Sequence, residues 1–293
     1  YPTEEQKILL GKTFGCCRFL YNQMLDDKIR EYEKTKKMLK NTPAMYKREY
    51  PFLKEVDSLA LANVQLHLEK AYKNFFRDPK IGFPRFKSKH HSRNSYTTNV
   101  VNGNILVESK KIRLPKLKWI AMKKHREPAE GLRLKSVTVS MEPSGKYFAS
   151  LLYEGYSCEN QAAEPDYSTA KILGIDYAMQ GMAVFSEKIE TEEAGFFRKN
   201  EKRLAREQRK LSRCVRGSHN YELQKKKVAR CHEKIRNQRR DHLHKLSRKI
   251  ADSYDAVAVE DIDMKAMGQC LHFGKSVQDN GYGMFREMLD YKL

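Results

Sequence analysis

Two stretches within the first ninety residues place apolar side chains three and four positions apart, the spacing of one face of a helix. The first runs from Thr3 to about Lys37, and the second follows the breaks at Pro43 and Pro51 and ends near Asp78. Their apolar positions are Cys17, Leu20, Tyr21, Met24 and Leu25 in the first stretch, and Leu59, Ala62, Leu66, Tyr72, Phe75 and Phe76 in the second. The pattern predicts a mainly helical region over residues 1–94.

The segment from Gly82 to Lys89 alternates aromatic and basic side chains, and Pro84 keeps it from forming a helix. Aromatic rings can stack on nucleic-acid bases while the neighbouring cations contact phosphates. An ordinary loop whose phenylalanines fill a core explains the composition equally well.

Strand-like segments follow, and the last two flank a turn at Ser144-Gly145, which predicts a hairpin. The segments are Asn104–Val107, Lys111–Leu114, Ser136–Met141 and Tyr147–Tyr153. We expect a small β-barrel or sheet within residues 95–160. The polar residues 161–170, which include Pro165, are predicted to form a linker.

The remaining residues, 171–293, are expected to form a further domain that mixes strands and helices. Ile172–Asp176 and Met182–Phe185 are two short apolar segments that would pair as a hairpin through a turn at Gly181. Ala256–Glu260 is a further strand candidate, and a helix is predicted from Gly281 to Leu293.

Between these strands, the chain from Asn200 to Asp252 is strongly basic and helical in pattern, and Gly217-Ser218 divides it into two helices. Its apolar stripe consists of Val228, Ile235, Leu246 and Ile250. Most of the lysines and arginines lie outside that stripe, so we expect a cationic surface on this pair of helices.

The composition supports a polyanionic partner. The chain has 293 residues, with Lys+Arg 57 against Asp+Glu 37 and a formal net charge of +20. Solubility alone requires a net charge of only about 2–8 in a small domain. Nucleic acid is therefore favoured over an excess of charge that serves solubility alone.

The sequence gives little indication of a membrane span, a zinc site or a disulfide framework. No stretch approaches the roughly 20 apolar residues of a membrane span, so we expect a cytoplasmic, nucleoid-associated protein without a membrane partner. The six cysteines form no C-x-x-C pair, and we expect no zinc ligands and no disulfide framework. The chain begins with Tyr1 rather than Met and stops at Leu293 within a helix-like run, so we expect a fragment at both ends.

Two carboxylates end apolar strand candidates: Asp176 after Leu173 to Ile175, and Glu260 after Val257 to Val259. Strand-end carboxylates on neighbouring strands can converge and bind a hard divalent cation such as Mg²⁺. This would be a metal-dependent phosphodiester cleavage site. A helix cap or a surface charge is the commoner role of such residues.

The acids directly after Glu260 leave two roles open. Asp261 and Asp263 could join a metal shell or cap a following helix, and capping is favoured for Asp263.

Taken together, these segments resemble the OrfB/TnpB family of insertion-sequence proteins, and the similarity covers nearly the whole chain. The segments that carry the resemblance are Gly82 to Lys89, Glu201 to Ser212, Gly217-Ser218, Lys227 to Arg230, Asp241 to Ser247, Glu260 to Lys265 and Phe273 to Ser276. The resemblance implies an α+β multidomain fold. Its parts would be a helical recognition region (1–94), a wedge-like β-barrel (95–160), a linker (161–170) and a RuvC-like domain of the RNase H fold (171–293) with the basic helical pair inserted.

The resemblance also implies an activity, an RNA-guided DNA endonuclease encoded by a mobile element and related to the type V CRISPR effectors. Its partners would be a guide RNA, double-stranded DNA and displaced single-stranded DNA. Asp176 and Glu260 match the first two catalytic carboxylates, as ligands of Mg²⁺ or, as an alternative, Mn²⁺. The nucleic-acid contacts would include Tyr96, Thr98 and Asn102 at the target-adjacent duplex, together with Arg85, Lys87, Lys89, Arg203, Arg206, Arg209, Lys210, Lys227, Arg230, Arg236, Arg239 and Lys245.

Several positions depart from the family pattern. Family members continue beyond the equivalent of Leu293 into C-x-x-C knuckles and a third catalytic aspartate, and we expect this chain to be catalytically incomplete without them. Ala178 stands where glycine is usual, while Cys231 and His242 stand where leucine and phenylalanine are common. Two other functions stay open, a non-catalytic RNA- and DNA-binding regulator and a transposase that joins DNA strands itself.

Overall fold

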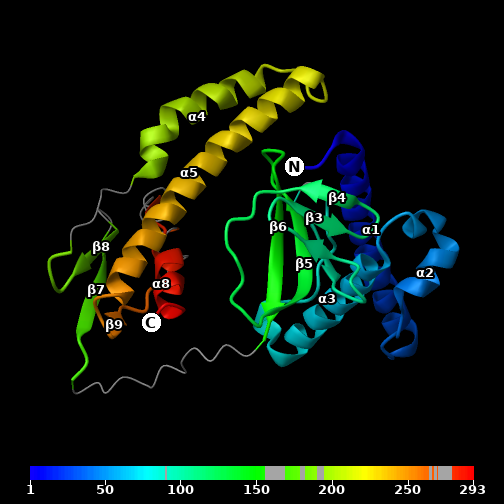
Figure 1. Cartoon of the computed structure of the whole chain (residues 1–293), viewed down its shortest axis with the longest axis horizontal. Coiled ribbons are helices and arrows are strands. Elements are labelled where there is room, and N and C mark those ends of the chain that lie inside the picture. The colour runs from blue at the N-terminus through cyan, green and yellow to red at the C-terminus, as the bar shows by residue number, and fades with distance from the viewer. Residues whose placement is uncertain are drawn as a thin grey trace. The chain divides into compact units, whose positions relative to one another are not determined.

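The computed structural model describes residues 1–89, 91–155, 169–178, 182–189, 195–263, 266, 269 and 279–293. The chain divides into two compact units, Tyr1–Cys158 and Glu159–Leu293, here called unit 1 and unit 2 (Figure 1). Gly181, residues 161–168 of the predicted linker, Met264, Lys265 and the segment from Phe273 to Ser276 lie outside the described residues.

The two helices predicted at the start of the chain are confirmed. α1 spans Glu4–Thr35 and begins with a capping box between Thr3 and Gln6, while α3 spans Ser58–Arg77 and begins at the N-cap Asp57. Between and after them lie three short elements that the apolar spacing did not reveal: α2 (Pro43–Glu49), η1 (Pro51–Lys54) and η2 (Pro79–Ile81).

The strands of unit 1 form two separate antiparallel sheets. One has the order β1-β5-β6 and the other β2-β3-β4. Their bounds are β1 Asn94–Asn99, β2 Leu106–Val107, β3 Lys111–Leu114, β4 Lys118–Ala121, β5 Arg133–Met141 and β6 Tyr147–Glu154. The predicted hairpin is confirmed, because β5 and β6 pair around a turn in which Gly145 has a φ of 85°.

The prediction of a β-barrel is wrong for the described residues. A barrel requires the first and last strands of one sheet to pair, whereas β1 and β6 are both edges of their sheet. Alternation of apolar and polar residues predicts strands, but closure depends on how the strands tilt and pair.

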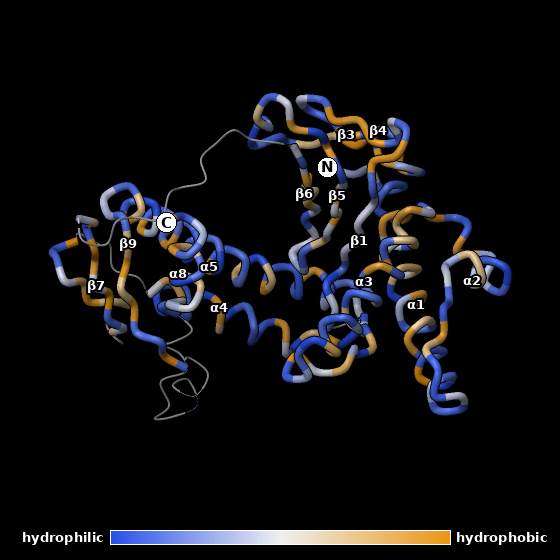
Figure 2. Tube along the Cα trace, turned by 90° about the horizontal axis from the view of Figure 1, so that it is seen from below, coloured by the Kyte–Doolittle hydropathy of each residue, from blue (hydrophilic) through white to orange (hydrophobic). Residues whose placement is uncertain are grey.

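One hydrophobic core joins the helices and strands of unit 1. Leu20, Met24 and Leu68 from the helices belong to the same cluster as Val137 and Val139 from β5. The helical stretch and the sheets therefore stabilise each other, and Figure 2 shows hydrophobic positions spread along both.

Unit 2 contains a mixed three-stranded sheet of order β8-β7-β9. β7 (Ile172–Ala178) and β8 (Met182–Phe185) are antiparallel, which confirms the predicted hairpin, and β9 (Ala256–Val259) pairs with β7 in parallel. Its core combines strand residues with residues of α5 (His219–Ala251) and α8 (Tyr282–Asp290). The core includes Leu173, Ile175, Leu243, Ile250 and Phe285.

The predicted pair of basic helices is confirmed as α4 (Phe196–Ser212) and α5, which lie side by side (Figure 1). A small apolar cluster of Leu204, Cys231 and Ile235 holds them together. In Figure 2 both helices are mostly hydrophilic, with single hydrophobic positions along them. Among the described residues, no helix is long and apolar enough to cross a membrane.

Candidate active site and nucleic-acid interface

The two candidate catalytic carboxylates lie on neighbouring strands of unit 2, Asp176 within β7 and Glu260 directly after β9. In the parallel pairing of β7 with β9, Ile175 lies opposite Val259, and the next residues are Asp176 and Glu260. A side-chain hydrogen bond between Glu260 and Asp176 raises the pKa of Glu260 above its ordinary value, with smaller contributions from desolvation and from the charge of Asp176. The prediction that these two acids meet on adjacent strands is confirmed.

Aromatic side chains border the carboxylate pair. The rings of Tyr177 and Tyr282 pack edge to face at 5.1 Å between centroids, and both hydroxyl groups are buried without a hydrogen-bond partner among the described residues. Burial raises the pKa of Tyr282; Arg286 lowers it, and the charges of Glu260 and Asp176 raise it further, so Tyr282 lies within electrostatic reach of both acids.

The donor set suits a hard divalent cation. Asp176 and Glu260 are exposed oxygen ligands in direct contact, and a second negative charge at this spacing is unfavourable unless a cation or a proton neutralises it. Mg²⁺ is commonly held by one or two carboxylates together with other oxygen ligands. No group of three or more His, Cys, Asp or Glu residues that could hold a metal is found in the described part of the chain.

The neighbouring acids have other partners. Asp261 forms an ion pair with Arg286 at 2.9 Å. Asp263 accepts a hydrogen bond from the backbone N–H of Ala266 at 3.1 Å, as expected of a capping residue. The capping role predicted for Asp263 is confirmed.

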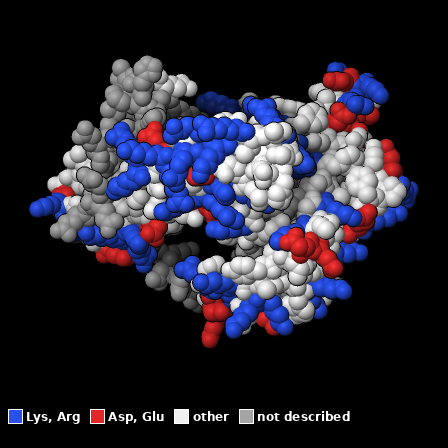
Figure 3. All heavy atoms as spheres, turned by 90° about the horizontal axis from the view of Figure 1, so that it is seen from above, with Lys and Arg blue, Asp and Glu red and all other residues white. Residues whose placement is uncertain are grey.

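The cationic surface predicted for the helical pair is present on unit 2. α4 and α5 carry eighteen lysines and arginines against five acidic residues. Figure 3 shows Lys and Arg side chains gathered in a broad patch over these helices. A surface of this kind attracts phosphates without reading the base sequence.

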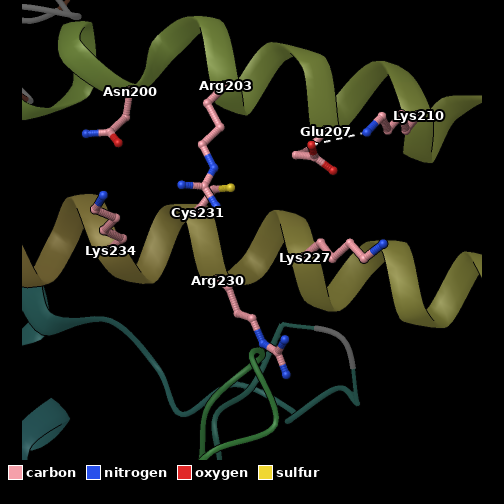
Figure 4. A pocket seen from close by; sticks show the side chains of 8 residues that line it. All are labelled: Asn200, Arg203, Glu207, Lys210, Lys227, Arg230, Cys231 and Lys234. Atoms are coloured by element: carbon pink, nitrogen blue, oxygen red, sulfur yellow. Dashed lines mark hydrogen bonds and ion pairs between the residues drawn. The ribbon is translucent and has the colours of Figure 1, made fainter.

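A cavity of about 290 Å³ lies between α4 and α5. It is lined by Asn200, Arg203, Glu207, Lys210, Lys227, Arg230, Cys231 and Lys234 (Figure 4). In Figure 4 the side chains of Arg203 and Lys234 point into the space between the two helices, whereas Arg230 points away from α4. The family resemblance had implied four of these residues as nucleic-acid contacts, Arg203, Lys210, Lys227 and Arg230. It missed Asn200 and Lys234, which one helical turn would have brought to the same face as Arg203 and Arg230.

One carboxylate stands among these cations. Glu207 accepts a hydrogen bond from the amide of Gln224 at 2.8 Å and pairs with Lys210 at 3.4 Å. The hydrogen bond from Gln224, followed by the charge of Lys210, lowers the pKa of Glu207. The carboxylate therefore stays ionised and fixes the position of Lys210 at the rim of the cavity.

The other predicted cations of the helical pair differ in their availability. Arg206 lies 3.5 Å from Glu207, Arg209 bonds to the carbonyl of Ala205, and Lys245 forms an exposed ion pair with Asp241. Arg236 also has an interaction partner.

Arg239 requires a correction. Its guanidinium pairs with the buried Asp279 at 3.3 Å and is only 20% exposed, so it serves the fold of unit 2 rather than a surface for phosphates.

Two of the predicted contacts in unit 1 also require correction. Tyr96 is 5% exposed, and Thr98 is fully buried, where its hydroxyl donates a hydrogen bond to Asp57. Both side chains belong to the interior of unit 1 and do not reach its outer surface in this conformation. Asn102, by contrast, lies exposed in a turn with a φ of 49°.

The basic residues of the Gly82 to Lys89 segment differ in their partners. Arg85, Lys87 and Lys89 are all exposed, but Lys87 also contacts an aromatic ring. The ammonium group of Lys87 lies 4.0 Å from the centre of the Tyr21 ring, and burial lowers its pKa. Lys87 therefore anchors the segment to α1.

The comparisons with known proteins cover both units. Residues 155–270 match a family model described as "Probable transposase" (OrfB_IS605), and residues 1–37 match its helix-turn-helix domain. A protein of Streptomyces pristinaespiralis named "Putative RNA-guided DNA endonuclease" is 31% identical over all of this chain and 72% of its own length. The chain belongs to the OrfB/TnpB family. A second OrfB/TnpB relative, the Escherichia coli protein named "Putative RNA-guided DNA endonuclease InsQ", is 30% identical over 99% of this chain and 75% of its own length.

Two further findings concern structure. The segment matched as a helix-turn-helix forms one continuous helix, α1, in this OrfB/TnpB member. A cryo-EM structure of a Cas12f1-sgRNA-target DNA complex aligns with 98% of the chain at 13% identity, but its TM-score of 0.26 is too low to show a shared arrangement.

The departures from the family pattern can now be located. Cys231 is buried against Leu204 and Ile235, where it packs as a small apolar residue. The ring of His242 packs against Phe196 at 5.5 Å, and Ala178 ends β7, two residues after Asp176.

Proposed function

We propose that this chain acts as a transposon-encoded, RNA-guided DNA endonuclease. Residues 171–293 would be its RuvC-like nuclease domain, and residues 1–94 and 95–160 its recognition and wedge-like regions. The observation that supports this most directly is the contact between Asp176 of β7 and Glu260, which follows the parallel strand β9, in the same unit as the cationic helical pair. The names of the two relatives support the same activity.

Asp176 and Glu260 would hold a divalent cation, Mg²⁺ or Mn²⁺. When bound, such an ion supplies charge stabilisation at a phosphodiester. The two side chains orient their carboxylate oxygens toward one place because β7 and β9 are in register. Both carboxyl groups must be ionised to face a cation, and a bound cation would oppose the rise that Asp176 causes in the pKa of Glu260.

The helical pair α4 and α5 would hold nucleic acid by its backbone. Arg203, Lys227 and Lys234 line the cavity between the helices. Lysine and arginine contacts of this kind are independent of base sequence, and in guided systems the sequence is read by base pairing with the RNA. We propose guide RNA and double-stranded and displaced single-stranded DNA as the partners.

A DNA strand-transfer transposase is the second candidate function, favoured by the description of the family model. A non-catalytic regulator would use the same cationic helices without the carboxylate pair.

One reaction separates the three candidates. The full-length protein is incubated with its RNA, Mg²⁺ and duplex DNA that carries a sequence complementary to the guide, and the products are resolved by length. Double-strand breaks that require both RNA and Mg²⁺ support the endonuclease. Joined strands would favour the transposase, and tight binding without any product would favour the regulator.

A further inference from the structure

The C-terminal end of α3 carries a cluster of aromatic rings on the surface of unit 1. Tyr72, Phe75, Phe76 and Phe83, here called the aromatic cluster, contact one another with centroid distances between 5.4 and 6.2 Å. Tyr72 is buried and anchors the cluster, whereas Phe76 is 66% exposed and Phe83 is 45% exposed. Nearby Ile81 and Phe86 are exposed as well.

The cluster is not needed to close the core of unit 1. Of its four rings, Tyr72 alone belongs to the buried core. Phe83 belongs to the Gly82 to Lys89 segment. Its ring packs against Tyr72 and Phe75, which both lie on α3. Large exposed rings that pack on one another, rather than into a core, are typical of a binding surface.

The charges around the aromatic cluster indicate what it binds. Lys73 and Arg77 lie on α3, Lys80 on η2 and Arg85 in the following segment, and all four are exposed. Their side chains form no ion pair within the described residues. Asp78 is the acid within this stretch of chain, and it accepts a hydrogen bond from the backbone N–H of Lys80.

Unpaired nucleotides offer both of the chemical groups that this surface complements. A base offers an aromatic face for Phe76 or Phe83, and its phosphate offers a charge for the flanking cations. In a duplex the base faces are stacked on one another, so a duplex satisfies the cations only. We propose that the aromatic cluster is a stacking platform for single-stranded nucleic acid.

The test measures binding of labelled oligo(dT) and oligo(rU) to the full chain with a chelator present, at salt high enough to suppress phosphate contacts elsewhere on this basic protein. Phe76→Ala is expected to weaken binding by about tenfold, the effect of losing one stacked base. A loss with either oligomer supports the proposal, and the oligomer with the larger loss identifies the strand.

Two comparisons isolate the stacking contribution. Phe76→Leu keeps an apolar side chain but removes the ring, so it is expected to bind as weakly as Phe76→Ala. An oligomer whose nucleotides are abasic keeps the phosphates and removes the bases, so wild type and Phe76→Ala should bind it equally.

Phe52→Ala provides a matched control, because Phe52 is 42% exposed and packs against Phe19, away from the cluster in sequence. It should bind like wild type. Full affinity in Phe76→Leu, or an equal loss of affinity for the abasic oligomer, would overturn the proposal. Because the assay contains a chelator and measures no cleavage, its result is independent of the proposed endonuclease activity.

Discussion

Unit 1 and unit 2 use their polar residues in different ways. In unit 1, buried polar side chains close the fold: Asn41 donates to Tyr46, Tyr46 donates to Asp27, and Thr98 donates to Asp57 at the start of α3. In unit 2, the most prominent polar residues are exposed: the cations of α4 and α5, and the carboxylates Asp176 on the central strand β7 and Glu260 after β9.

The two units also differ in how their cores are built. One large cluster ties all the long elements of unit 1 together. Unit 2 has a core around its sheet and a separate cluster of three buried residues between α4 and α5. Because the apolar contact between α4 and α5 is narrow, most of the surface of these helices can carry charged side chains. We infer that most elements of unit 1 pack into one core, whereas in unit 2 the helices α4 and α5 share a small apolar contact and present a cationic surface.

The largest effect is expected at the carboxylate pair of unit 2, and it tests cleavage separately from binding by the basic helices. Asp176→Ala should lower the rate of Mg²⁺-dependent DNA cleavage by the full-length protein by about 10³-fold. The proposed metal ion stabilises the charge of the transition state by several kcal/mol, and this variant would lose one of its ligands. Cleavage is measured in single-turnover reactions with guide RNA bound.

Asp252→Ala is the matched control for Asp176→Ala. Asp252 is an exposed acid that pairs with Arg248 at 3.1 Å at the end of α5, and its loss should leave the rate unchanged. Cleavage by Asp176→Ala at the wild-type rate would remove Asp176 from the site.

Core substitutions test whether each unit depends on its own cluster. Leu25 and Leu243 are both fully buried, the first in unit 1 and the second in unit 2. Each change to Ala should cost about 3 kcal/mol in the free energy of unfolding. The single tryptophan, Trp119, lies in unit 1, so its fluorescence should report the loss in Leu25→Ala, and circular dichroism should report both.

We expect Leu243→Ala to leave the fluorescence transition of Trp119 unchanged. A shift of the Trp119 fluorescence transition in Leu243→Ala, as large as that in Leu25→Ala, would show that the two cores unfold as one.

A smaller effect is expected at the buried ion pair of unit 2. Asp279 accepts hydrogen bonds from the backbone N–H groups of Phe197 and Arg198 at the start of α4 and pairs with Arg239. Asp279→Asn should destabilise unit 2 by about 2 kcal/mol, because it leaves the largely buried Arg239 without a counter-charge. Urea titration followed by circular dichroism measures the change.

The surface pair of Asp241 and Lys245 provides the comparison for Asp279→Asn. Asp241→Asn breaks an exposed pair on the same unit and should cost only a few tenths of a kcal/mol. Equal costs for the two variants would mean that Asp279 is not the anchor of α4.

The smallest effect concerns the cavity between the basic helices. Arg203→Ala combined with Lys234→Ala should weaken nucleic-acid binding by about tenfold and reduce the slope of log K against log salt by about 2, one for each lost phosphate contact. A double change of Lys7 and Lys12 to Ala removes as much charge from unit 1, where both lysines pair with glutamates, and should alter the slope less. Equal slopes would indicate that binding follows net charge alone.

Much of the fold follows from local patterns. The apolar spacing around Leu20 and Met24 predicted α1, the Ser144-Gly145 turn predicted the β5-β6 hairpin, and the breaks at Gly217-Ser218 separated α4 from α5. β1 was missed because its residues, Asn94 to Asn99, are mostly polar, and only pairing with β5 makes them a strand. β4, Lys118–Ala121, was missed as well. The other strands of unit 1 were predicted, but the division of the strands into two open sheets was not.

For the candidate site, the sequence by itself determined which residues could carry charge and which apolar strand segments they follow, since composition and periodicity are properties of neighbouring residues. It placed the end of β7 at Asp176, whereas β7 continues to Ala178. It could not determine which of the charged residues are available. Tyr96 and Thr98 lie in a core, Arg239 is held by Asp279, and Lys87 lies over Tyr21, because each meets residues distant in sequence. The same long-range packing brought Asp176 to Glu260, which are 84 positions apart, and placed Lys234 beside Arg203. Burial and pairing across such separations depend on the whole chain's packing, and only the tertiary structure decided them.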